Sequence, residues 1–376
     1  MRPATLRILL FITSLILVPS LTYLVILFAR GYRPDLPNKT IQPTGLLVAT
    51  STPDGAQIYV DGKLLSATNT TTNLEPGTYQ IEIKKDGFQA WKKSLVLQAE
   101  IVTRASATLF PSVPSLKAIT TGGASNPILA PDGTKVAFTQ SGKLYTLDLT
   151  ESPLGLISRD PKLLSNINSG GSQKSKLSTI TWSPDSRQIL AGPSLFDIST
   201  SQVSSASSVL ISSWNTRQQT LDDQRFLTLP ETLQNILATS AADLVWSPKE
   251  TKLLYTATAS AIIPDNIKKP LPGSSTQTQD RHLTPHTSYV YDLEEDRNFK
   301  IDPGYSWFPD SSHLFKTENK QIIITEYDGQ NQTVVYDGPM EKDLAVPYPS
   351  GKQILILTNL NPTLSSIPNL YAVSLR

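Results

Sequence analysis

The pattern of hydrophobic and polar positions divides the chain into three regions. Residues 8–28 form an uninterrupted apolar run, ILLFITSLILVPSLTYLVILF. Residues 45–111 alternate between apolar and polar positions, and so do many short segments between residues 115 and 376. A period of two is typical of β-strands with one buried face. The pattern predicts an N-terminal helix and then an all-β chain, with no helix-period segment in the C-terminal region.

The apolar run is long enough to cross a lipid bilayer. At about 1.5 Å per residue its length reaches roughly 30 Å, the thickness of the hydrocarbon core. A cleaved signal peptide is the alternative, but its apolar region is usually about 7 to 15 residues long and ends in small residues. This run ends in Phe28-Ala29-Arg30. We therefore predict an uncleaved transmembrane anchor over residues 1–29.

Charged residues flank the run on both sides. Arg2 and Arg7 precede it and Arg30 and Arg33 follow it, so the positive-inside rule orients the helix only weakly. Long polar domains translocate largely regardless of flanking charge. We expect a single-pass protein of the cell membrane, with a cytoplasmic N-terminus and extracytoplasmic domains. Residues 30–44 contain three prolines, which favour extended backbone and predict a semi-rigid stalk.

Residues 45–111 predict a small β-sandwich with one buried face on each sheet. Strand patterns surround turn signals such as PDG, DG and EPG. The segments TPDGAQIYVDG and LEPGTYQIEIKKDGFQAWKKSLVL resemble the two halves of the PEGA domain, with Asp54 where that family usually has Glu. The resemblance implies an extracytoplasmic, non-catalytic β module of membrane-anchored or surface proteins.

Lysines and aromatic residues alternate in the second half of this domain. The candidate binding patch consists of Lys84, Lys85, Phe88, Trp91, Lys92 and Lys93. Such a patch suits an anionic polymer or lipid headgroups. The alternative places the aromatic rings in the core and the lysines at solvated strand edges. The alternative is favoured, because six basic and six acidic residues cancel within the domain.

The C-terminal region contains five variants of one motif: LAPDGTKVAF, TWSPDSRQIL, VWSPKETKLL, SWFPDSSHLF and VPYPSGKQIL. Their prolines are Pro131, Pro184, Pro248, Pro309 and Pro349, at spacings of 53, 64, 61 and 40 residues. Repeats of about 40 to 60 residues in an all-β context indicate a β-propeller with one motif in each blade. We expect five blades over residues 115–376; six is the alternative, with one hidden in a longer spacing.

The motif has the residues of a type I turn, with a local acceptor such as Ser183 first, proline second and Gly133 at the favourable fourth position of its copy. Trp182, Trp246 and Trp307 come just before their turns, and we expect them to wedge between adjacent blades. The last unit is one strand short, so we expect residues 115–122 to complete the final blade and close the ring.

These units resemble the TolB-like propeller repeat, whose turn reads W-S-P-D-G; TWSPDS and APDG are the nearest copies here. The resemblance implies partner binding, or a filter beside a catalytic domain. The α/β-hydrolase domain that accompanies some such propellers has no room in this chain.

Signals for catalysis or cofactors are weak. The chain has no cysteine and three histidines, and no two glycines are spaced as in a G-x-S-x-G elbow or a G-x-G loop. Pro285 separates His282 from His286, so a zinc site is not expected. The cluster at residues 292–297 is typical of a solvated loop and not of a calcium site. We predict no enzyme activity, no catalytic or metal site and no cofactor.

Composition leaves partner binding as the leading hypothesis. The net charge of +1 provides no overall field for nucleic acid, so we expect a protein or a cell-wall polymer as the partner in a bacterial envelope. Polar segments at residues 165–178, 199–208 and 270–288 predict rim loops that would carry the binding residues. The alternatives are a glycan-acting hydrolase or lyase with its site in the propeller channel, and a sensory module.

Overall fold

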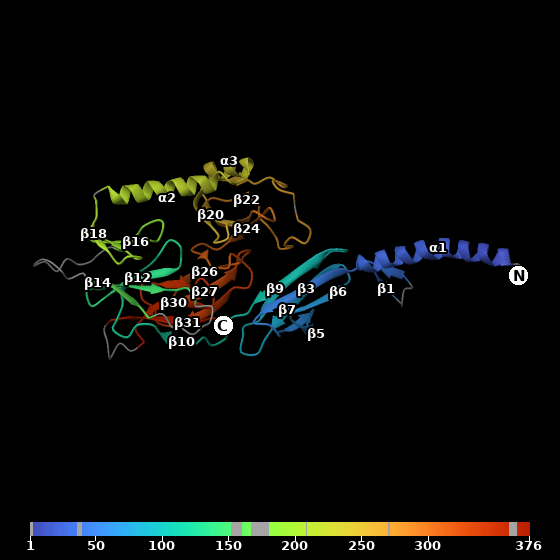
Figure 1. Cartoon of the computed structure of the whole chain (residues 1–376), viewed down its shortest axis with the longest axis horizontal. Coiled ribbons are helices and arrows are strands. Elements are labelled where there is room, and N and C mark those ends of the chain that lie inside the picture. The colour runs from blue at the N-terminus through green and yellow to red at the C-terminus, as the bar shows by residue number, and fades with distance from the viewer. Residues whose placement is uncertain are drawn as a thin grey trace, which may run out of the picture. The chain divides into compact units, whose positions relative to one another are not determined.

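The computed structural model describes residues 3–35, 40–151, 160–166, 180–207, 209–269, 271–360 and 367–376. The chain divides into two compact units (Figure 1). Unit 1 comprises Met1–Leu109 and Pro270–Gln277, and unit 2 comprises Phe110–Lys269 and Thr278–Arg376.

Unit 1 begins with α1 (Pro3–Ala29), a single helix that continues through Pro19. Its segment Leu10–Ala29 has a mean hydropathy of 2.3, and it is long and apolar enough to cross a membrane. Gly31, at a φ of 93°, ends the helix: its N–H donates to Phe28 O (3.1 Å), and the next N–H, that of Tyr32, donates to Leu27 O (3.0 Å). This is the Schellman arrangement, in which a left-handed glycine reverses the chain.

The segment expected to be an extended stalk forms a hairpin. β1 (Arg33–Asp35) pairs antiparallel with β2 (Thr40–Gln42), with Pro34 opposite Ile41. Proline fixes φ in the extended region, which suits the edge of a short strand as well as a linker. The stalk prediction is therefore wrong for these two strands; Pro37 lies outside the described residues.

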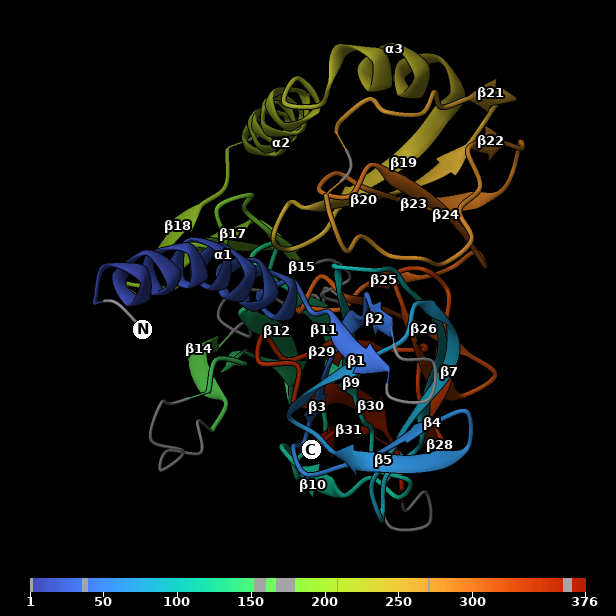
Figure 2. The same ribbon diagram turned by 90° about the vertical axis from the view of Figure 1, so that its right-hand side faces the viewer.

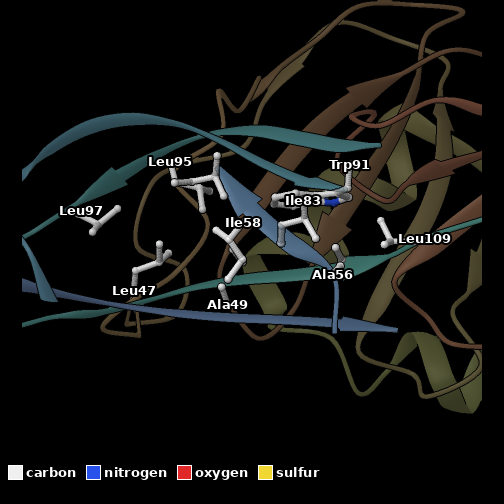
Figure 3. Close-up of a cluster of buried hydrophobic side chains, with 12 residues drawn as sticks. Leu47, Ala49, Ala56, Ile58, Ile83, Trp91, Leu95, Leu97 and Leu109 are labelled. Atoms are coloured by element: carbon white, nitrogen blue, oxygen red, sulfur yellow. The ribbon is translucent and has the colours of Figure 1, made fainter. Parts of the chain in front are cut away.

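Seven strands of unit 1 form two sheets. The first has the order β6-β3-β9 and the second β5-β4-β7-β8. The bounds are β3 (Gly45–Thr52), β4 (Gln57–Val60), β5 (Lys63–Ala67), β6 (Thr70–Leu74), β7 (Gly77–Lys84), β8 (Trp91–Leu97) and β9 (Val102–Thr108). Alternate side chains of both sheets, including Leu47, Ile58, Ile83 and Trp91, meet in one buried cluster (Figure 3). The predicted sandwich is confirmed.

The described strands of unit 2 form five four-stranded blades, each a separate antiparallel sheet. Blade 1 contains β11 (Ser125–Leu129), β12 (Lys135–Gln140), β13 (Lys143–Asp148) and β14 (Lys162–Asn166). Blade 2 contains β15 (Ile180–Trp182), β16 (Gln188–Ala191), β17 (Ser194–Asp197) and β18 (Val203–Ser205). Blade 3 contains β19 (Ala241–Trp246), β20 (Lys252–Ala257), β23 (Ser288–Asp292) and β24 (Arg297–Ile301), with a side ribbon of β21 (Ala261–Ile262) and β22 (His282–Leu283).

Blade 4 contains β25 (Ser306–Trp307), β26 (His313–Glu318), β27 (Gln321–Glu326) and β28 (Thr333–Asp337). Blade 5 contains β29 (Ala345–Pro347), β30 (Gln353–Thr358), β31 (Asn369–Ser374) and β10 (Leu116–Ala118). β10 pairs with β31, so that Leu116 lies opposite Val373. The first strand of the propeller therefore completes its last blade, as expected, and the five-bladed prediction is confirmed.

Two helices interrupt the repeats between blades 2 and 3, where none is predicted. α2 (Leu210–Phe226) and α3 (Glu231–Ser240) lead into β19 (Figure 2). The segment SVLISSW has the composition of a strand, but its last five residues, from Leu210, begin α2. The fourth strand of blade 2 is instead β18, in a segment predicted to be a loop. α2 has no buried residue, so its sequence lacks the apolar periodicity that reveals a helix.

Buried apolar clusters join four of the five neighbouring blade pairs. Leu144 of blade 1 meets Ile189 of blade 2, and other clusters join blades 3 and 4, 4 and 5, and 5 and 1. Among the described residues no such cluster joins blades 2 and 3. The face of blade 3 opposite to blade 4 instead packs its Tyr255 against Leu233 and Leu237 of α3. The helical insertion thus replaces a blade-to-blade interface.

Candidate functional site: a pocket lined by the blade-motif turns

The five motif copies form the same turn. In each copy, the residue two positions after the proline donates its backbone N–H to the carbonyl of the residue that precedes the proline, at 2.8–3.2 Å. These donors are Gly133, Ser186, Glu250, Ser311 and Gly351, and all have φ between 56° and 70°. A type I turn followed by a left-handed residue is a common three-residue hairpin loop, and the left-handed position explains the glycine in two of the copies.

Two motif side chains link a blade to the one before it. Trp182 of blade 2 donates its indole N–H to the Ile128 carbonyl of blade 1 (3.0 Å), and the Oγ of Ser186 accepts the N–H of Asp132 (3.0 Å). Blade 4 repeats both bonds toward blade 3. Trp307 donates to the Val245 carbonyl (2.8 Å), and the Oγ of Ser311 accepts the N–H of Lys249 (2.9 Å).

The copy in blade 3 departs from this scheme. Glu250 stands where blades 2 and 4 have serine, and its carboxylate pairs with Arg225 of α2 (3.0 Å). Trp246 is half-buried and packs within the blade 3 cluster, and the described residues give its indole no hydrogen bond to blade 2. Blades 2 and 4 have both a tryptophan two residues before the proline and a serine two residues after it. This combination is a sequence signal that counting the motif copies does not use. It marks blades 2 and 4, which make both hydrogen bonds to the preceding blade.

The motif turns line a pocket of about 700 Å³ in unit 2. Its walls come from four blades and from the end of α2. The lining residues are Leu129, Pro131, Asp132, Gly133, Arg225, Val245, Trp246, Ser247, Pro248, Glu250, Ser306, Trp307, Pro309, Phe315, Ala345, Pro347 and Pro349. The sequence predicts binding residues in the rim loops between the copies. The pocket instead uses the copies themselves, because turns that close successive blades at the same end of the sheets gather at one face.

The pocket lining is mainly apolar. Five prolines and two tryptophans contribute to it, and the charged residues of the lining are Asp132, Glu250 and Arg225. The Asp132 carboxylate accepts hydrogen bonds from the N–H (2.9 Å) and hydroxyl (2.8 Å) of Thr134, and Glu250 is paired with Arg225. Both carboxylates thus have structural partners, which favours recognition of apolar groups over acid–base chemistry.

α2 contacts the rest of unit 2 both by packing, through Phe226 against the blade 3 cluster, and by charge. Arg225 reaches the turn of blade 3, and Arg217 lies close enough to the turn of blade 2 to act on Asp185. The hydrogen bond from Ser183 and, to a smaller extent, the positive charge of Arg217 hold the pKa of Asp185 below its ordinary value. Exposed ion pairs contribute at most about 1 kcal/mol each.

The candidate lysine–aromatic patch of unit 1 does not form one surface. Trp91 is buried in the sandwich core and Phe88 packs partly against it. Lys84 and Lys92 both pair with Glu82 on the outer face of β7 and β8 (2.9 and 3.0 Å). Lys85 donates instead to the Asp54 carbonyl (2.8 Å). Strand alternation sends Trp91 inward and Lys92 outward, whereas the half-buried Lys93 lies on the same face of β8 as Trp91, opposite the buried Ile81.

Metal-binding clusters are absent from the described part of the chain, which holds no group of three or more histidine or acidic side chains placed for a metal ion. His282 lies in β22, whereas His286 is in a turn with φ of 62°. Of the predicted rim loops, residues 167–178 lie outside the described residues. Within the third, Gln277 donates its side-chain amide to the Ser94 carbonyl of β8 (2.7 Å), so this part belongs to unit 1.

Comparisons with known proteins give a family match for the sandwich domain and low-scoring structural similarities for the chain. Residues 44–112 match the model of the PEGA domain. The comparison with curated proteins found no match. Among solved structures, similar chains include a TolB-type protein of Agrobacterium tumefaciens (13% identity, 65% of this chain and 76% of that chain, TM-score 0.22) and TolB of Acinetobacter baumannii (12%, 85% and 63%, 0.22).

A third similar structure is the β-propeller domain of a protein from Myceliophteria thermophila (11% identity, 70% of this chain and 100% of that chain, TM-score 0.32). Scores at this level carry no conclusion, so the propeller assignment rests on the blades themselves: five four-stranded sheets with one motif turn each. The chain therefore matches the PEGA domain at residues 44–112, and unit 2 is a five-bladed β-propeller.

Proposed function

We propose that this protein is a membrane-anchored, extracytoplasmic binding module of the cell envelope that holds a protein partner in the propeller pocket. Support for the anchor comes from α1, whose apolar segment matches the bilayer thickness, and from the PEGA domain, an extracytoplasmic module. Support for binding comes from the pocket lining.

The single observation that carries the binding role is the convergence of prolines and tryptophans from four blades on one pocket. Concave apolar surfaces with a few polar groups are the usual form of a binding site. Rigid rings lose little conformational entropy when a partner is bound, because proline and tryptophan have few rotatable bonds. Asp132 is bonded to Thr134 and Glu250 is paired with Arg225. These two carboxylates therefore give no support to the alternative of a glycan-acting enzyme. The protein is therefore proposed to be a binding protein and not an enzyme.

Site-specific photocrosslinking in intact cells tests the proposal. A benzophenone amino acid replaces Val245, a pocket residue that is 48% exposed. The matched control is Val203, 52% exposed on β18 and outside the pocket lining. We expect a discrete adduct at Val245 that a Trp246→Ala change reduces at least several-fold, and none at Val203. Equal adducts at both positions, or none at Val245, would reject the pocket as the binding site.

Topology is tested with single cysteines, because the native chain has none. Cysteines at the exposed residues Val113 and Val334 of unit 2 should react with a membrane-impermeant maleimide once the outer barrier is opened, with the cell membrane intact. Protection of both residues until the cell membrane is lysed would place the propeller in the cytoplasm and overturn the proposed location.

A further inference from the structure

The end of α1 is bound directly to the β1–β2 hairpin. Arg33 donates from Nη1 to the Phe28 carbonyl in the last helical turn (3.2 Å), and its guanidinium carbon lies 5.9 Å from the centre of the Phe28 ring. The chain reaches Arg33 through the tight reversal at Gly31. The side chain of Arg33 is therefore held at the level where the apolar helix ends.

The hairpin is also fixed to the sandwich. The Thr44 hydroxyl donates to the Gly31 carbonyl and accepts from the Asn73 amide (2.9 Å). Arg33 donates from Nη2 to the same Asn73 side chain (3.3 Å), and the Tyr32 hydroxyl donates to Glu100 (2.8 Å). These bonds come from three separate parts of the sandwich, so helix, hairpin and sandwich form one connected body without a free linker.

These contacts limit how far the hairpin can lie from the bilayer. The headgroup layer is roughly 5 to 8 Å thick on each side of the hydrocarbon core. Strands of three residues are only about 10 Å long, and the chain turns back at Gly31 instead of continuing outward. We propose that the paired strands β1 and β2 are a membrane-contact element that rests in the phospholipid headgroup layer beside the end of α1. This inference rests on the proposed transmembrane role of α1.

The exposed side chains of the hairpin suit that layer. Ile41 is 45% exposed and lies opposite Pro34 in the hairpin, and both Arg30 and Arg33 are exposed. Arginine can pair with lipid phosphates, and tyrosine, here the half-buried Tyr32, is enriched at membrane interfaces. Ile41 is next to Gln42, which lies opposite Arg33 in the hairpin, and an interfacial element can bury such an exposed isoleucine among acyl chains.

Electron paramagnetic resonance of the full chain in nanodiscs of phosphatidylcholine and phosphatidylglycerol tests this inference. A nitroxide is attached to Ile41→Cys and, as the matched control, to Leu64→Cys on β5, which is 60% exposed. The native chain contributes no other thiol. Collision rates with dissolved oxygen and with a water-soluble nickel chelate then report the depth of each label.

We expect the label at residue 41 to collide with the nickel chelate at least about threefold less often than the label at residue 64, because a polar chelate partitions into water and away from the apolar side of the interface. An Arg30→Gln change should raise the nickel collisions at residue 41 and leave those at residue 64 unchanged. Equal nickel collisions at both labels in a chain that resists alkaline extraction would overturn the inference and leave the anchor intact. Release of the chain by alkaline extraction would instead reject the anchor itself.

Discussion

Trp182 donates its indole N–H to the carbonyl of Ile128, 54 residues earlier and in the preceding blade. The bond is 3.0 Å long, and the indole ring is buried among residues of blades 1 and 2. Trp307 and Val245 repeat this relationship between blades 4 and 3. The motif tryptophan thus joins blades by a polar bond as well as by packing.

Replacement of the tryptophans by phenylalanine should separate these two contributions. Trp307→Phe removes the indole donor and leaves the Val245 carbonyl without that partner, which typically costs about 1–3 kcal/mol. Trp246→Phe should cost less than about 1 kcal/mol, because Trp246 is half-buried and its indole makes no such bond among the described residues. Urea unfolding of the purified chain measures both; equal losses would contradict the assigned role of the hydrogen bond.

Substitutions of Ser311 should separate the stability contributed by its hydroxyl, which bonds to blade 3, from the strain of its left-handed backbone. Ser311→Ala removes the acceptor of the Lys249 N–H and keeps a side chain at a φ of 63°, so we expect a loss of about 1 kcal/mol. Ser311→Gly removes the same acceptor but relieves the left-handed strain. The glycine variant should therefore unfold at a higher urea concentration than the alanine variant, and the opposite order would show that the turn is unstrained.

Glu250 provides a test at the interface between blades 2 and 3. It has a φ of 56° where two other copies have glycine, and its ion pair with Arg225 joins side chains that are 55% and 46% exposed. Such a pair contributes at most about 1 kcal/mol, which is similar to the strain that glycine removes. Glu250→Gly should therefore leave the free energy of unfolding unchanged or raise it slightly. A loss above about 2 kcal/mol would show that α2 depends strongly on this pair.

Tyr348 should make the propeller sensitive to alkaline pH. Burial and, to a smaller extent, the nearby carboxylate of Glu151 raise the pKa of Tyr348 to about 12. Since the unfolded chain ionises near pH 10, the stability that the neutral phenol contributes is complete below pH 10 and is lost as the pH rises through 12.

The corresponding measurement compares the native chain with Tyr348→Phe between pH 8 and about 12. The difference in the free energy of unfolding should change by up to about 2–3 kcal/mol over this range, with the phenylalanine variant losing less. Parallel pH profiles of the two chains would show that Tyr348 ionises as easily in the folded state as in the unfolded chain.

The regular parts of the fold follow from local sequence. A period of two, with turn residues at fixed positions, is enough to predict the sandwich and the blades, because strand faces and turn conformations depend on near neighbours. The count of motif prolines predicts five blades, and the missing strand of the last unit predicts the pairing of β10 with β31. The apolar run predicts α1 because a bilayer requires length and composition alone.

Tertiary contacts decide the remaining features. α2 has no buried face, so its sequence shows no apolar period. The β1–β2 hairpin is fixed through Asn73, which is 40 residues from Arg33 in the sequence. The pocket exists only because four turns, whose prolines are 117, 61 and 40 residues apart in sequence order, meet at one face. Local sequence therefore determines the turn that each proline makes, whereas the packing of the blades decides which of these turns line one pocket.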